Sequence, residues 1–182
     1  MNKIFTTILI SAITMSFTGL VSATTAEGKA TYKAAKESAD ADYKIAHEKC
    51  NSLSGNPKDV CVAEADAVRT RSKSEAEAGY KNTARARANA RIAIASADHD
   101  VAKAKCGSQA GNEKDVCLKE AKAAYVVAKA DAKSDKKVSM ARADARDDKN
   151  DANYKVALEK CDALVGAAKD TCVSSAKTQF NK

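Results

Sequence analysis

Large apolar side chains are scarce in this chain of 182 residues. It has no Trp, three Phe and five Tyr, and alanine supplies nearly half of its apolar residues. A conventional core of bulky side chains is therefore excluded, because the supply of Leu, Ile, Val and Phe is near the level at which disorder becomes the expectation. Some other interaction must hold the folded chain together.

Helix-breaking residues are almost as scarce. The sequence has one Pro and seven Gly. Ala, Lys, Glu and Arg are abundant, and these residues favour helices because they lose little side-chain entropy there. The composition predicts an all-α protein.

The N-terminal segment is typical of a secretory signal peptide. Lys3 is followed by an uncharged, largely apolar run over residues 4–20 and by small residues that end at Ala23. This pattern predicts a signal peptide over residues 1–23. The run is too short and too rich in Thr and Ser for a comfortable membrane span, so we expect no transmembrane segment after cleavage. We expect a periplasmic protein, with secretion as the alternative.

Six cysteines recur in three pairs, and an even number in an exported chain favours disulfides. Ten residues separate the two members of each pair, and a Gly lies five residues after the first member. Flanking residues recur as well, with a period of 55 to 56 residues. This internal repeat predicts three helical hairpins, over residues 24–82, 83–138 and 139–182. The pairs are Cys50 and Cys61, Cys106 and Cys117, and Cys161 and Cys172.

Each gap between paired cysteines has the features of a turn between helices. Gly55 suits a left-handed position just past a helix end, Asn56 suits an N-cap, and Pro57 suits the first helical position. Antiparallel helices packed through small residues run roughly 8 Å apart, which brings facing cysteines within disulfide range. A continuous helix would instead separate them by about 16 Å. We therefore predict pairing within each hairpin, with each bond contributing on the order of 3 kcal/mol.

The stretches between the turns have few breakers. We expect a long helix from Pro57 to Gln109, bent near residues 79–83, and a poorly packed helix over residues 129–151. The predicted fold is three tandem disulfide-stapled helical hairpins that form an elongated or folded-back bundle. The expected core positions are Ile45, Val101 and Val156 together with Val62, Leu118 and Val173, with Tyr43 and Tyr154 covering the cores of the hairpins.

The sequence offers no convergent set of catalytic groups. His47 lies one turn before Cys50, but the other two hairpins lack this His. In the run Asp98-His99-Asp100, the adjacent side chains would point in different directions on a helix. We therefore expect no enzyme activity, no metal site and no cofactor.

The formal net charge is +7, and positive residues concentrate between Arg69 and Arg91. This stretch is either a solvated helix face or a binding site for an anionic surface or polymer. A nucleic-acid partner is not expected, because the chain is exported and has neither aromatic platforms nor a known motif. The candidate anion-binding residues are Arg69, Arg71, Lys81, Arg85, Arg87 and Arg91.

In its Ala/Lys/Asp-rich composition the chain resembles a group of small exported helical proteins of proteobacteria. Their composition is similar to that of the helical middle domain of the envelope protein TolA. The resemblance implies long helices. It implies no Tol-type function, because nothing in this sequence corresponds to the membrane anchor or terminal binding domain of TolA.

These observations favour a non-enzymatic periplasmic protein with an envelope-associated structural, adaptor or chaperone-like role, whose partners are envelope proteins. The first alternative is binding of lipopolysaccharide or acidic lipid through the basic stretch. The second is redox or metal handling by the cysteine pairs, which the absence of a C-x-x-C motif disfavours. The oligomeric state does not follow from the sequence.

Overall fold

The computed structural model describes residues 26–182, so the predicted signal peptide lies outside the described residues. This part of the chain is all-α, as predicted, and no strand occurs within it. Its elements are α1 (Ala26–Cys50), α2 (Gly55–Lys81), α3 (Ala84–Lys105), the short 3-10 helix η1 (Cys106–Ser108), α4 (Gly111–Asp162) and α5 (Gly166–Phe180).

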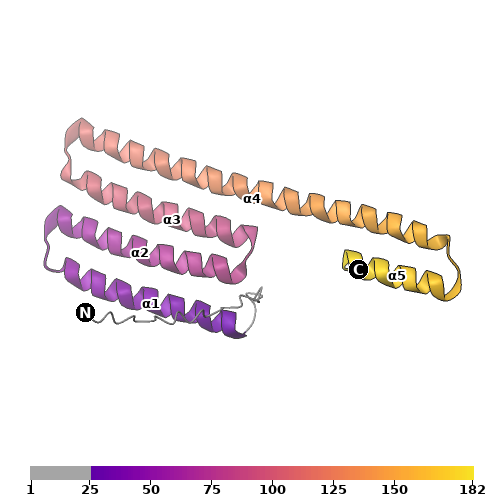
Figure 1. The fold of residues 1–182 in the computed structure, drawn as a ribbon. Coiled ribbons are helices and arrows are strands. Elements are labelled where there is room, and N and C mark those ends of the chain that lie inside the picture. The colour runs from indigo at the N-terminus through magenta and orange to yellow at the C-terminus, as the bar shows by residue number, and fades with distance from the viewer. Residues whose placement is uncertain (1–25) are drawn as a thin grey trace, which may run out of the picture.

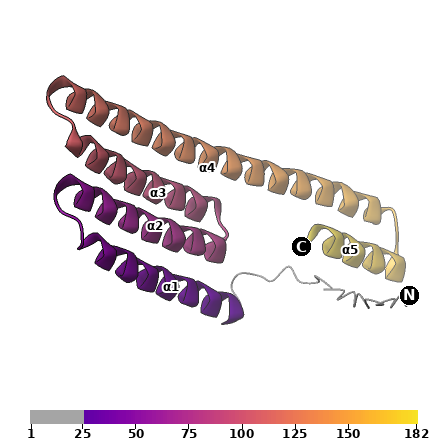
Figure 2. The same ribbon diagram turned by 60° about the vertical axis from the view of Figure 1, so that its left-hand side comes forward.

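Helices α1 to α4 lie side by side in chain order as one antiparallel layer (Figure 1). Substantial contacts join α1 to α2, α2 to α3 and α3 to α4, that is, only helices adjacent in the layer. The same order is visible after rotation (Figure 2). Because no described helix covers the layer, both of its broad faces are open to solvent.

The third hairpin extends away from this layer. Helix α4 has 52 residues and so measures about 78 Å, far longer than the 22-residue α3 beside its first part. Its second part packs against α5, which folds back along the same side of α4 as α3 (Figure 1). The molecule therefore combines a folded-back layer with a projecting hairpin.

The three predicted disulfides are present, and each joins the two helices of one hairpin. The Cα–Cα distances are 5.6, 5.8 and 5.7 Å for the bonds that begin at Cys50, Cys106 and Cys161. The described part of the chain has no free cysteine.

The cysteine-containing turns differ in detail from the prediction. Gly55 has a left-handed φ of +61°, as expected, but it begins α2 and four turn residues separate it from the end of α1. Asn56 is not the N-cap, because Ser54 occupies that position. The Asn56 side chain instead donates a 2.6 Å hydrogen bond to the carbonyl oxygen of Ala104 in α3. A bond between residues so distant in the chain leaves no local signal in the sequence.

The expected bend near residues 79–83 is a complete chain reversal. Asn82 takes the left-handed conformation with φ +44°, and its backbone N–H bonds to the carbonyl oxygen of Ala78. Thr83 then caps α3, because its side chain accepts a 3.0 Å hydrogen bond from the backbone N–H of Ala86. Two residues thus end one helix and begin the next, and the expected long helix becomes the antiparallel pair α2 and α3.

No such reversal interrupts α4. Val138 and Ser139 occupy the place of Asn82 and Thr83, and the segment between Cys117 and Cys161 is one residue shorter than the equivalent segment of the preceding unit. A β-branched Val disfavours the left-handed conformation, so the helix continues. The poorly packed helix predicted for residues 129–151 is confirmed, and both Val138 and Met140 are about half exposed.

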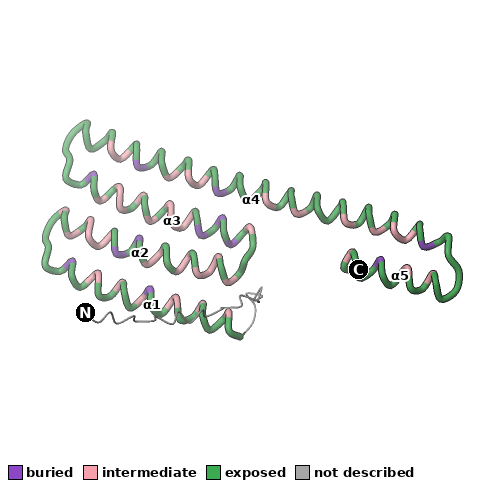
Figure 3. Tube along the Cα trace, viewed as in Figure 1, coloured by how far each residue is buried: buried purple, intermediate pink, exposed green. Residues whose placement is uncertain are grey.

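Alanine and cysteine supply every fully buried position of the described chain (Figure 3). The core prediction was wrong for Ile45 and Val156, which are 55% and 54% exposed. A single layer buries only the narrow strip of each helix that faces its neighbour, so Ile45 on a broad face remains in solvent, and Val156 remains in solvent on the side of α4 that no helix covers. The other expected core residues, Val62, Val101, Leu118 and Val173, are half-buried.

Candidate functional site

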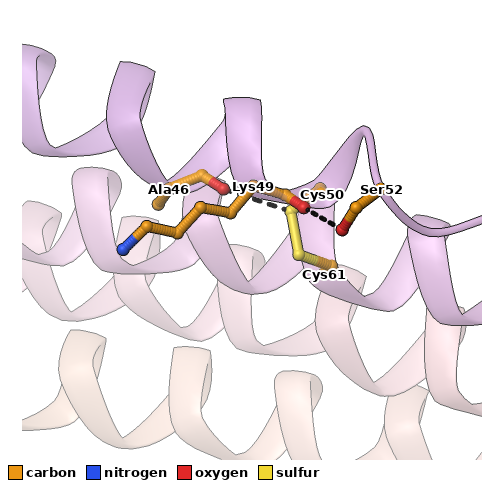
Figure 4. Close-up of a disulfide and its surroundings, with 5 residues drawn as sticks. All are labelled: Ala46, Lys49, Cys50, Ser52 and Cys61. Carbon is orange, nitrogen blue, oxygen red and sulfur yellow. Dashed lines mark hydrogen bonds between the residues drawn. A yellow bond between two sulfur atoms is a disulfide. The ribbon is translucent and has the colours of Figure 1, made fainter.

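The disulfides lie at the turn ends of the hairpins. In each bond the first cysteine is almost completely buried and the second is partly buried. Figure 4 shows Cys50 bonded to Cys61, with its sulfur 3.4 Å from the carbonyl oxygen of Ala46. Burial of one sulfur limits attack by an external thiolate, which redox exchange requires.

The candidate anion-binding residues do not form one patch. Arg69 and Lys73 both bind Asp40 of α1, at 2.6 and 3.0 Å. These two cations hold the pKa of the Asp40 carboxyl below its ordinary value, mainly through the hydrogen bond from Lys73. Arg69 also lies over the ring of Tyr43, 4.8 Å from its centroid. This group therefore joins α1 to α2.

The other basic residues of the stretch point elsewhere. Arg71 binds Asp98 of α3 at 3.0 Å, and Arg91 binds Asp135 of α4. Lys81 pairs with Glu77, which raises the pKa of the lysine, and Arg87 donates to the side chain of Asn82. Arg85 is exposed. Sequence reasoning missed the carboxylates that bind Arg69, Arg71 and Arg91, because these carboxylates lie on neighbouring helices.

Aromatic contacts join the helices of each hairpin. Tyr32 and Tyr80 stack with a centroid separation of 4.9 Å at the open end of the first hairpin. Tyr154 lies 6.0 Å from Phe180 at the open end of the third. Tyr154 thus has an interhelical role, whereas Tyr43 contacts His47 on its own helix as well as Arg69. These rings compensate in part for the scarcity of larger core residues.

Each of the two histidine side chains lies beside a tyrosine ring. His47 lies beside Tyr43, and His99 lies beside Tyr125 of α4 and 3.8 Å from Asp100. Between residues 26 and 182 no group of three metal-ligating side chains comes together. Cys50 is bonded to Cys61 and so cannot act with His47 as a thiolate ligand.

Shallow hollows occur on the surface. One lies between α1 and α2 and is lined in part by Ile45 and Val68, which are 55% and 62% exposed. Another lies along α4 in the interval between α3 and α5, where Arg142, Arg146 and Lys149 line it. The first is an apolar surface surrounded by charged residues, and the second is basic.

Comparisons with protein families, curated proteins and solved structures found no match to this chain. None of the helices within residues 26–182 has a segment that is long and apolar enough to cross a membrane.

Proposed function

We propose that the protein is a non-enzymatic, exported helical scaffold that binds other proteins of the cell envelope in the periplasm. The open helical layer supports this proposal most directly. Its broad faces carry exposed Ile45 and Val68 around one hollow, with charged side chains nearby. Exposed apolar patches surrounded by polar residues are typical of protein interaction sites.

The disulfides fit such a role in an oxidising compartment. They constrain the hairpins of a chain that has few large buried side chains, and so they keep an extended surface in one shape without a second layer. A partner would bind a preformed surface and would not have to order it, which lowers the entropic cost of association.

The proposal is tested by photo-cross-linking in the periplasm. A photoreactive amino acid replaces Ile45 or Val68 in the apolar hollow, and Lys33, on the same helix as Ile45, serves as the control position. We expect adducts with defined envelope proteins at the first two positions and few at the third. The variant Ile45→Glu should prevent adduct formation at position 68. Equal, diffuse labelling at all three positions, or no adduct at any of them, would contradict partner binding through this face.

An adaptor and a chaperone-like protein differ in what they bind. An adaptor yields the same few partners whether or not the cells are stressed. A chaperone-like protein yields many unfolded clients and suppresses the aggregation of a reduced test protein. We favour the adaptor, because rigid disulfide-closed hairpins present a fixed surface, whereas promiscuous binding surfaces are usually flexible.

Binding of anionic envelope components through the basic stretch is the alternative. It would compete with the ion pairs that Arg69, Arg71 and Arg91 make within the chain. The triple variant Arg85→Gln, Arg87→Gln and Arg91→Gln should then weaken binding to lipopolysaccharide or acidic vesicles and flatten its salt dependence. Unchanged binding would exclude this site.

A further inference from the structure

One long side of α4 has no neighbouring helix (Figures 1 and 2). Helical periodicity places four valines on this side, within about 40° of one another around the axis. Ala121, buried beside α3, and Cys161, bonded to α5, lie on other sides of the helix. The valines and their exposed fractions are Val116 (47%), Val127 (59%), Val138 (45%) and Val156 (54%).

The contact between α2 and α3 indicates which kind of helix surface would pack against the open side of α4. Ion pairs line this antiparallel contact, with Glu64 2.9 Å from Lys105 and Arg71 3.0 Å from Asp98. Small residues lie between the helices, and Ala90 is buried there.

Both partners of that contact recur in the sequence of α4. Its first part repeats α2, so that Val116-Cys117 and Glu120-Ala121 correspond to Val60-Cys61 and Glu64-Ala65. Its second part repeats α3, where residues 141–146 (Ala-Arg-Ala-Asp-Ala-Arg) correspond to residues 86–91 (Ala-Arg-Ala-Asn-Ala-Arg).

The two repeated surfaces cannot meet within one chain. Both surfaces lie on the continuous helix α4. Val138 occupies the repeat position of Asn82, whose turn separates α2 from α3, and no turn forms at Val138. As a result Ala145 is exposed, although its counterpart Ala90 is buried. Two complementary surfaces therefore remain open, one on each half of α4.

We propose that a second copy of this chain covers this side of α4, with the two α4 helices antiparallel about a two-fold axis level with residue 140, so that Val138 is the nearest valine to the axis. The first half of each α4 then packs against the second half of the other, which reproduces the α2–α3 contact twice. Such an interface is self-complementary and closes as a dimer. The dimer does not depend on the proposed scaffold function.

Charge complementarity supports this occupant. Translating the Glu64–Lys105 ion pair by the repeat period places Glu120 opposite the partner's Lys160, whereas the Arg71–Asp98 pair is replaced by Val127 opposite the partner's Asn153. The same register places Asp131 opposite the partner's Lys149. All four charged side chains are exposed, and within residues 26–182 none of them makes an ion pair. The two-fold axis makes each interchain pair occur twice.

The available surface is large enough for a stable dimer. In this register residues 118–162 of the two α4 helices overlap, and a strip about 68 Å long and about 10 Å wide corresponds to on the order of 700 Å² per copy. This is the usual size of a specific protein interface. Valines and alanines would lie along its middle and charges along its edges.

Sedimentation velocity on the oxidised protein over about 1 to 100 µM tests the proposal. We expect a concentration-dependent dimer. Lys160→Glu should raise the dissociation constant about tenfold, because two attractive pairs become repulsive. The double variant Glu120→Lys with Lys160→Glu should restore the dimer to within about threefold. Lys155→Glu makes the same charge change on another side of α4 and should have no effect, and circular dichroism checks that every variant stays helical.

The position of the two-fold axis has its own test. With a short thiol cross-linker, Val138→Cys should give a covalent dimer, whereas Met140→Cys, on the other side of the helix, should not. A monomer at all concentrations would overturn the proposal. So would a dimer that is insensitive to the charge changes, or a monomer in which the third hairpin has folded back onto the free side of its own α4.

Discussion

Helix α5 is the element that depends most on its disulfide. It has 15 residues, packs substantially only against α4, and fully buries only Ala176. An isolated helix of this length is marginal in water. Besides the Cys161–Cys172 bond, α5 is held by the contact of Phe180 with Tyr154, by a 2.9 Å hydrogen bond from Asn150 to the carbonyl oxygen of Phe180, and by exposed ion pairs of Lys169 with Asp162 and of Lys182 with Asp151. The double variant Cys161→Ala with Cys172→Ala should therefore release this helix.

The size of the effect follows from loop closure. The sequence separation of 11 closes a short loop, and the chain-entropy relation assigns such a bond about 3 kcal/mol. The free energy of opening α5 away from α4 should fall by that amount. At room temperature this raises the population of the open state about 100-fold.

Native-state hydrogen exchange read by mass spectrometry measures this directly. Peptides from α5 should lose about 100-fold of protection in the variant, while peptides from α2 and α3 should keep theirs, because neither helix packs against α5. The matched control removes Cys50 and Cys61. Helix α1 should lose less protection there, because it has 25 residues against 15 in α5 and because the Tyr32–Tyr80 stack and the two ion pairs of Asp40 join it to α2. Unchanged exchange in α5, or an equal loss throughout the chain, would refute the reasoning.

Three further perturbations test the layer. Asp40→Asn should lower the urea midpoint by more at pH 7 than at pH 2. The pKa of Asp40 is lowered in the folded state, so its stabilising effect is present above the unfolded pKa and is lost as the pH falls through the folded value; an equal difference at both pH values would contradict the role of Arg69 and Lys73. Thr83→Ala removes a cap and should cost about 1 kcal/mol in urea unfolding, with Thr83→Ser retaining most of it; an unchanged midpoint for the alanine variant would show that the cap is unimportant. Gly111→Ala should lower the free energy of unfolding by about 1 to 2 kcal/mol in thermal unfolding, because Gly111 has a left-handed φ of +55°. The cost would not come from a steric clash, since no atom lies within 4 Å of the added Cβ, and a neutral result would show that the turn relaxes.

The helices and the disulfides could be predicted from the sequence because their signals are local. Alanine-rich stretches without breakers specify helix, and the spacing of the cysteine pairs excludes bonding within one helix. The chain reversal at Asn82 was predicted only as a bend, because the local signal for it is weak. Its signal is only two residues long, and Asn and Thr also occur in the interior of helices, so the sequence indicated a bend and not a turn.

The positions of the larger side chains could not be predicted because they depend on the number of layers. Ile45 and Val156 lie at matching repeat positions, which would be core positions in a bundle. In this structure Ile45 lies on an open face of the layer, and Val156 lies on the side of α4 that has no neighbouring helix. Likewise, the basic residues looked free in the sequence, but the carboxylates that bind Arg71 and Arg91 belong to helices that only the tertiary fold brings alongside.

Native mass spectrometry of the protein purified from the periplasm without reductant tests the account most directly. In the proposed function, an exported, disulfide-closed helical layer holds other proteins. We predict a chain that begins at Thr24, is lighter by six hydrogens than its reduced form, and is recovered in complex with defined envelope proteins. Free thiols on the native chain, or a tightly bound lipid or metal in place of a protein partner, would contradict this account.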